Sequence, residues 1–95
     1  MYILITYDVD TSTKEGARRL RQVAKACKDY GQRVQNSVFE CCLTEANLII
    51  LKERISNIID AKLDSIRIYN LGKQYGKTTV LGKETSFDFN DSFII

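Results

Sequence analysis

The 95-residue sequence predicts an α+β domain with a ferredoxin-like βαββαβ order, an extra C-terminal strand and a homodimeric assembly. Two observations predict the elements: runs of β-branched and aromatic residues alternate with period two, and two apolar stripes recur at helical spacing. The third observation is their order, which predicts an antiparallel four-stranded sheet with both helices on one face. The other face has no helix of its own, so we expect a second copy of the chain to cover it.

Length and composition bound the function classes. We place a ferredoxin-like domain at residues 1–82 and a tail that packs on the partner subunit at residues 83–95. The chain starts with a strand rather than a secretory leader, and no apolar stretch could span a membrane, so we expect a cytoplasmic protein. The sequence holds no His, which excludes a His general base and a His-ligated zinc site. Its three Cys lack metal-ligand spacing and are interpreted as reduced core residues.

The first strand, at residues 2–10, is the stretch that the other elements are expected to surround. Its alternation places Ile3, Ile5 and Tyr7 on one face, and Asp8 on the other face at the end of the strand. An acid at the end of a central strand is a candidate functional residue. The alternative is that Asp8 only begins a turn, because Asp favours turns.

The first helix is predicted over residues 14–29. Ser12 is the expected N-cap, with Glu15 reaching back in a capping box, and Gly31 is expected in the left-handed position after the helix. Its apolar stripe consists of Ala17, Leu20, Val23, Ala24 and Cys27.

Positive charge is concentrated between residues 14 and 33. Two carboxylates in this segment, Glu15 and Asp29, oppose seven cations: Lys14, Arg18, Arg19, Arg21, Lys25, Lys28 and Arg33. Such a run indicates either a solvated helix face or a surface that binds phosphates.

The remaining elements complete the second half of the fold. Strands are expected at residues 32–35 and 37–43 around a tight turn near Asn36, followed by a helix that Thr44 caps and that ends at Ile59 or Asp60. A fourth strand at residues 65–71 ends at Gly72, and a short fifth strand covers residues 78–81. The first and fourth strands are expected at or near the centre of the sheet.

Several of these stretches together resemble a known family. They are Tyr7-Asp8, Arg18-Arg19-Leu20, the run from Tyr30 through Gln35-Asn36-Ser37-Val38-Phe39-Glu40, and Asp64 to Tyr69. In these residues the chain is similar to the CRISPR-associated Cas-two family, small nuclease-like proteins of the adaptation module. The resemblance spans residues 2–72, and its character indicates the branch found in type I-C systems.

The resemblance implies a ferredoxin-like homodimer in which Asp8 from both subunits binds Mg²⁺ or Mn²⁺. It implies metal-dependent cleavage of RNA or double-stranded DNA in spacer acquisition and antiviral defence, and a complex with the CRISPR-adaptation integrase. The catalytic set expected from it is Asp8, Tyr7, Ser37 and Phe39. The nucleic-acid-binding set expected from the resemblance and from the basic segment is Arg18, Arg19, Arg33, Lys14 and Lys25.

Elementary chemistry agrees with a site shared between subunits. One carboxylate is a poor Mg²⁺ site, and a two-fold axis would bring two copies of Asp8 together. Phe39 is expected to wall the site, to stack a base or to belong to the dimer core. The alternative function is a non-catalytic DNA-binding scaffold that bridges the integrase. A third reading, a ferredoxin-like module for a small ligand, is disfavoured because the sequence has no Gly-rich phosphate loop.

Overall fold

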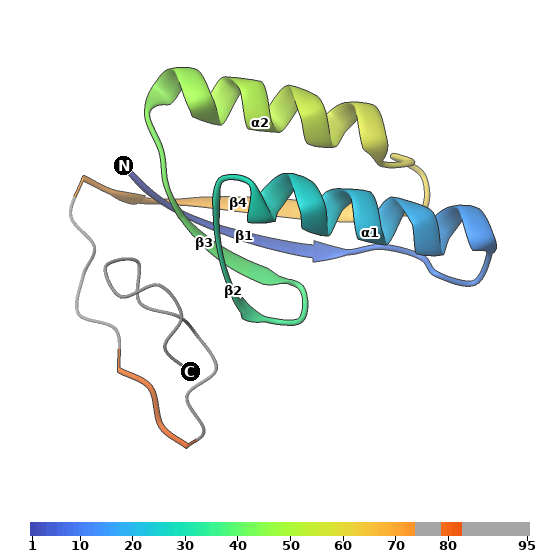
Figure 1. Cartoon of the computed structure of the whole chain (residues 1–95), viewed down its shortest axis with the longest axis horizontal. Coiled ribbons are helices and arrows are strands. Elements are labelled where there is room, and N and C mark those ends of the chain that lie inside the picture. The colour runs from blue at the N-terminus through green and yellow to red at the C-terminus, as the bar shows by residue number, and fades with distance from the viewer. Residues whose placement is uncertain (74–78, 83–95) are drawn as a thin grey trace.

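The computed structural model describes residues 1–73 and 79–82. The elements follow the order β1 (Tyr2–Asp8), α1 (Lys14–Lys28), β2 (Gly31–Gln35), β3 (Val38–Cys42), α2 (Glu45–Ile58) and β4 (Ser65–Gly72). Figure 1 shows the two helices side by side against the sheet. The predicted βαββαβ order is therefore confirmed.

The sheet is antiparallel throughout, in the order β2-β3-β1-β4. The two βαβ halves are interleaved: β3 lies between β1 and β2, and β1 lies between β3 and β4. The expectation of a central β1 is confirmed, whereas the expectation for β4 is wrong, because among the described strands β4 pairs with β1 alone and lies at the edge of the sheet. An amphipathic edge strand and an amphipathic central strand show the same alternation, so periodicity could not distinguish them.

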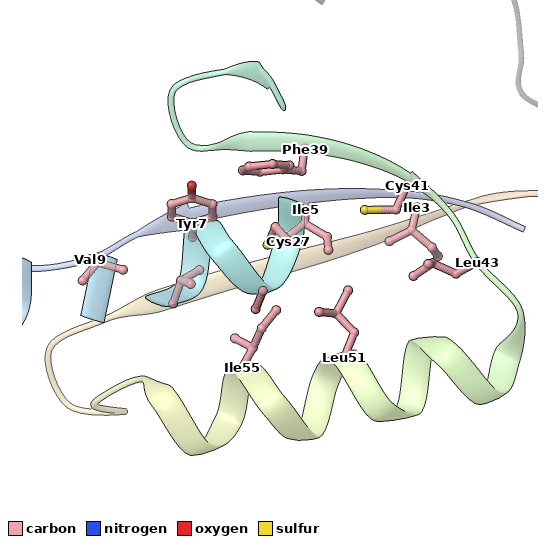
Figure 2. Close-up of a cluster of buried hydrophobic side chains, with 12 residues drawn as sticks. Ile3, Ile5, Tyr7, Val9, Cys27, Phe39, Cys41, Leu43, Leu51 and Ile55 are labelled. Atoms are coloured by element: carbon pink, nitrogen blue, oxygen red, sulfur yellow. The ribbon is translucent and has the colours of Figure 1, made fainter. Parts of the chain in front are cut away.

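The hydrophobic core lies between the helices and one face of the sheet. Along β1 the side chains of Ile3, Ile5 and Tyr7 are buried in turn, as predicted, while Asp8 is exposed. Figure 2 shows the buried cluster, which adds Val9, Cys27, Phe39, Cys41, Leu43, Leu51 and Ile55. The face without helices carries Leu4, Thr6 and Asp8, which lie opposite Tyr69, Arg67 and Ser65 of β4.

The N-cap of α1 differs from the prediction by one residue, although the helix begins at Lys14 as predicted. Thr13, not Ser12, is the N-cap, and its hydroxyl accepts a hydrogen bond from the Gly16 backbone at 3.1 Å. The Ser12 backbone N–H instead donates to Asp10 Oδ1 at 2.9 Å, so the Asp10 side chain forms a turn before the helix, and the cap is the next residue, Thr13. The cap predicted for α2 is confirmed, since Thr44 accepts from the Asn47 backbone.

Gly31 does not occupy a left-handed position after α1. The helix ends through Asp29 in the right-handed region, and Gly31 is already the first residue of β2. An added Cβ on Gly31 would lie 2.4 Å from both Cys41 Sγ and the Glu40 carbonyl oxygen. A glycine is therefore required at this position by the close packing of β2 against β3, and not by a left-handed backbone conformation.

The cysteine prediction is confirmed for two residues and wrong for one. Cys27 and Cys41 are buried, whereas Cys42 is exposed because it alternates to the other face of β3. Burial raises the pKa of Cys27 to about 11 and that of Cys41 to about 12, so both thiols stay protonated at neutral pH.

The predicted fifth strand is not formed within the described part of the chain. Thr79, Val80 and Leu81 have no strand pairing, and Leu81 is 89% exposed. A short strand is stable when it pairs with the edge of a sheet, and residues 79–81 pair with no edge of the described sheet. Thr78 and the predicted tail at residues 83–95 lie outside the described residues. No helix in the described ranges is long and apolar enough to cross a membrane.

Candidate functional site

Asp8 is the last residue of β1, on the face of the sheet that no helix covers. It is exposed and lies opposite Ser65 of β4. None of the hydrogen bonds or ion pairs recorded among the described residues uses the Asp8 carboxylate. This carboxylate is therefore free to bind a cation, as the sequence suggested.

A cation at Asp8 would need more ligands than the described part of one chain supplies. Within the described ranges no three His, Cys, Asp or Glu side chains lie close enough to hold a metal ion. The donor type is right, since carboxylate oxygens suit Mg²⁺ and Mn²⁺, but the number of ligands is too small. This observation is compatible with a site that two copies of Asp8 form together.

Arg67 is a cation on the same face that the sequence analysis did not select. Arg67 is exposed and lies opposite Thr6, so this pair is two residues along the strands from the Asp8–Ser65 pair. Its guanidinium donates to the Tyr69 hydroxyl at 3.3 Å. The sequence could have identified Arg67, because residues two apart on a strand point to the same face and Arg67 is two residues from Ser65.

Tyr7 points away from Asp8, into the side covered by helices. Its ring is 6% exposed, and its hydroxyl donates to the Asn36 carbonyl at 3.3 Å while its backbone N–H donates to Ser37 at 3.1 Å. Burial raises the pKa of Tyr7, although Arg33 opposes the shift, so the hydroxyl stays protonated at neutral pH. These contacts attach the β2–β3 turn to β1.

Phe39 belongs to the core of its own chain. It is 1% exposed, and its ring lies 6.2 Å from that of Tyr7 between centroids (Figure 2). The Arg33 guanidinium covers it at 5.2 Å from the ring centroid. The expectations that Phe39 stacks a base or forms the dimer core are therefore wrong, because the ring is already packed within the chain.

The structure thus separates the predicted catalytic set. Tyr7, Ser37 and Phe39 gather with Arg33 at the β2–β3 turn, whereas the Asp8 side chain lies on the opposite face of the sheet. Of that set, Tyr7 and Phe39 are buried and Ser37 is half-buried, whereas Asp8 is exposed.

A continuous basic stripe runs along the outer surface of α1. Its members follow each other at spacings of three or four residues, and all are exposed: Lys14, Arg18, Arg21, Lys25 and Lys28. At about 100° per residue they lie within an arc of about 80°, directly opposite the buried Val23. Three of these residues belong to the expected nucleic-acid-binding set; the helical spacing adds Arg21 and Lys28 of the same basic segment.

Arg19 does not belong to the basic stripe. Its Nε donates to Asp64 Oδ2 at 2.7 Å and its Nη2 lies 3.3 Å from Asp64 Oδ1. The expectation that Arg19 binds nucleic acid is corrected on this ground, because its charge is neutralised within the fold. Asp64 is the functional candidate that sequence reasoning missed, since nothing local marks a carboxylate whose partner lies 45 residues away.

The groups around Asp64 favour its ionised form. The Arg19 guanidinium lowers the pKa of Asp64, and backbone donors from Asp60 and Asp10 add to the effect against the opposing cost of burial. The side chain is fully buried, which makes it the only buried charged residue among the described residues.

The fold and the site define a ferredoxin-like protein with a free carboxylate at the end of its central strand and a basic outer helix. The chain belongs to the CRISPR associated protein Cas2 family, whose pattern matches residues 1–79. The expected family is confirmed, while the type I-C branch stays a prediction.

Relatives and solved structures agree with this assignment. The chain is 53% identical to the "CRISPR-associated endonuclease Cas2" of Halalkalibacterium halodurans, covering 99% of each chain. It is 50% identical to the "CRISPR-associated endoribonuclease Cas2 1" of Moorella thermoacetica over the full length of both. The crystal structure of Streptococcus pyogenes Cas2 at pH 6.5 matches with a TM-score of 0.77 and 57% identity, over 86% of this chain and 100% of that one.

Proposed function

We propose that two copies of this chain form a divalent-metal-dependent endonuclease that acts in CRISPR adaptation, with RNA or double-stranded DNA as substrate. The observation that carries the proposal is the exposed Asp8 carboxylate at the end of the central strand, on a face that no helix covers. The relatives' names, endonuclease and endoribonuclease, support the same reaction class.

A homodimer through the open face is part of this proposal. That face presents apolar and aromatic side chains of the edge strand, with Tyr69 42% and Leu71 49% exposed. A two-fold axis at this face would bring each patch against its own copy and place the two Asp8 side chains in one site. Sedimentation of the full chain is expected to give two protomers, and a stable monomer at micromolar concentration would contradict the proposal.

Asp8 from both subunits would hold Mg²⁺ or Mn²⁺. When bound, the cation supplies positive charge to the phosphate and makes a water molecule a better nucleophile. Arg67 lies on the same face and would hold a phosphate oxygen by a charge-assisted hydrogen bond. The chain has no His, so protein side chains contribute cation binding and phosphate binding rather than a histidine base.

A second candidate function is a non-catalytic scaffold that holds duplex DNA and bridges the CRISPR-adaptation integrase. A specific observation favours it: the basic stripe lies on the outer surface of α1, whereas Asp8 lies beyond the sheet on the opposite face. DNA bound along the stripe would therefore not need to reach Asp8. In this reading the metal site is dispensable for binding.

The Asp8→Asn variant tests the two functions against each other. Asn keeps the shape of the side chain but loses the charge that holds a cation, so cleavage by the dimer is expected to fall to background with duplex binding unchanged. The variant also removes repulsion between two carboxylates, so the metal-free melting temperature is expected to rise. Cleavage at the wild-type rate would reject Asp8 as the catalytic residue, and a wild-type protein without any metal-dependent cleavage would favour the scaffold.

A further inference from the structure

One buried carboxylate, that of Asp64, accepts four hydrogen bonds. Asp64 Oδ1 accepts from the Asp10 backbone N–H at 3.0 Å and from Arg19 Nη2 at 3.3 Å. Asp64 Oδ2 accepts from Arg19 Nε at 2.7 Å and from the Asp60 backbone N–H at 2.9 Å. Each oxygen therefore has two donors, and the side chain is fully buried.

These contacts surround the two strand ends that present Asp8. Asp10 follows Asp8 by two residues at the exit of β1, and Asp64 immediately precedes Ser65, the residue opposite Asp8 on β4. The carboxylate of Asp64 thus ties the exit of β1 to the entry of β4. It connects the two backbones on either side of the Asp8–Ser65 pair.

The exit of β1 is fixed from a third direction by α1. The Arg19 guanidinium contacts the Asp10 carbonyl oxygen at 3.5 Å, so both backbone polar groups of Asp10 have partners. Gly16 packs so closely that an added Cβ would lie 1.8 Å from the same carbonyl oxygen. The backbone two residues after Asp8 is therefore held by hydrogen bonds and by close packing.

We propose that Asp64 and Arg19 are positioning residues for Asp8: they hold the end of β1 so that the Asp8 carboxylate is oriented to bind a divalent cation. This inference rests on the proposed function. A cation site requires its ligands in a fixed orientation, and loss of the groups that orient ligands weakens metal binding by about 10- to 100-fold.

The arrangement favours positioning over a purely stabilising role. A buried ion pair is a weak source of stability, because the cost of desolvating both charges offsets their attraction. Four directed hydrogen bonds define instead where the backbone lies, because two of them come from backbone N–H groups: that of Asp10, two residues after Asp8, and that of Asp60, in the segment before β4. None of the hydrogen bonds or ion pairs of Asp64 and Arg19 involves Asp8, so the effect acts through the backbone.

The experiment compares three variants of the full-length dimer with the wild type. Asp64→Asn keeps one oxygen, and its amide nitrogen accepts no hydrogen bond, so two of the four donors lose their acceptor. Arg19→Lys is a milder variant that keeps the charge but loses the two-point contact. Asp29→Asn is the matched control, since it removes a carboxylate from an exposed ion pair with Arg54 at the other end of α1.

Two readouts are used on protein whose circular dichroism matches the wild type. Mg²⁺ titration followed by the amide shifts of residues 8 and 9 gives the metal affinity, and ¹⁵N relaxation gives the backbone order at residues 8–10. We expect about tenfold weaker Mg²⁺ binding in Asp64→Asn, with order parameters falling from about 0.85 towards 0.6. Arg19→Lys is expected to show a smaller change in the same direction, and Asp29→Asn none.

The outcomes separate this inference from the proposed function. Wild-type affinity and unchanged order in Asp64→Asn would overturn the positioning role. If the wild type binds no Mg²⁺ at Asp8, the result contradicts the proposed function, and the positioning role is judged from the order parameters alone. Lower order parameters in Asp64→Asn and Arg19→Lys, but not in Asp29→Asn, would support the positioning role. Unchanged order parameters would overturn it. If Asp64→Asn does not fold, Arg19→Lys decides by the same criteria.

Discussion

Arg19 and Asp64, 45 residues apart in the sequence, form a two-point contact at 2.7 Å and 3.3 Å. The contact joins α1 to the segment between α2 and β4, and it buries a carboxylate completely. It removes Arg19 from the basic surface of α1 and gives the chain a fixed point beside the exit of its central strand.

Asp64→Asn is expected to lower the free energy of unfolding by about 3–5 kcal/mol, because breaking a buried ion pair leaves the Arg19 charge without its partner. Urea denaturation at neutral pH measures this change. Asp29→Asn, whose side chain is 42% exposed, is expected to cost about 1 kcal/mol or less. Equal losses in the two variants would contradict the structural role assigned to Asp64.

Stability is expected to fall in acid, in part through Asp64. Its pKa in the folded chain lies below the ordinary value of about 3.9, chiefly because of Arg19. A lowered folded-state pKa contributes stability that is present above the unfolded pKa and is lost as the pH falls through the folded pKa. Urea midpoints of wild type and Asp64→Asn are therefore expected to differ most at neutral pH and to converge in acid. A constant difference at every pH would argue against an ionised Asp64.

Gly16→Ala is expected to destabilise the fold, against the usual rule for helices. Alanine normally stabilises a helix by about 1 kcal/mol relative to glycine. Here the added Cβ would lie 1.8 Å from the Asp10 carbonyl oxygen, so the helix or the β1 exit must move. We expect a loss of about 1–3 kcal/mol and a lower melting temperature. Gln22→Ala, on the exposed surface of α1, is the control that reports propensity alone.

Arg18→Ala combined with Arg21→Ala is expected to weaken duplex DNA binding equally for unrelated sequences. Each lost phosphate contact flattens the slope of log affinity against log salt by about one unit, so the pair should flatten it by about two. Anisotropy titrations over a series of salt concentrations measure the slope. Lys52→Ala with Lys62→Ala removes the same charge from exposed positions outside α1. An unchanged slope in the α1 variant, or an equal change in the control, would place the DNA elsewhere.

The sequence was sufficient for features that depend on neighbours along the chain. Alternation predicted which β1 side chains are buried, helical spacing predicted the stripe with Val23, and Thr44 was identified as a cap. It was less sufficient where two local signals compete, as at Ser12 and Thr13, where the turn formed by the Asp10 side chain leaves Thr13 to cap the helix.

What the sequence by itself determined is therefore the order of the elements, the faces of β1 and α1, the family and the place of Asp8 at the end of the first strand. Tertiary structure alone decided that β4 is an edge, that Phe39 is packed against Tyr7 within its own chain, and that Arg19 is bound to Asp64. The physical reason is that periodicity reports which way a side chain points relative to its own backbone. It carries no information on which distant residue the folded chain brings opposite that side chain.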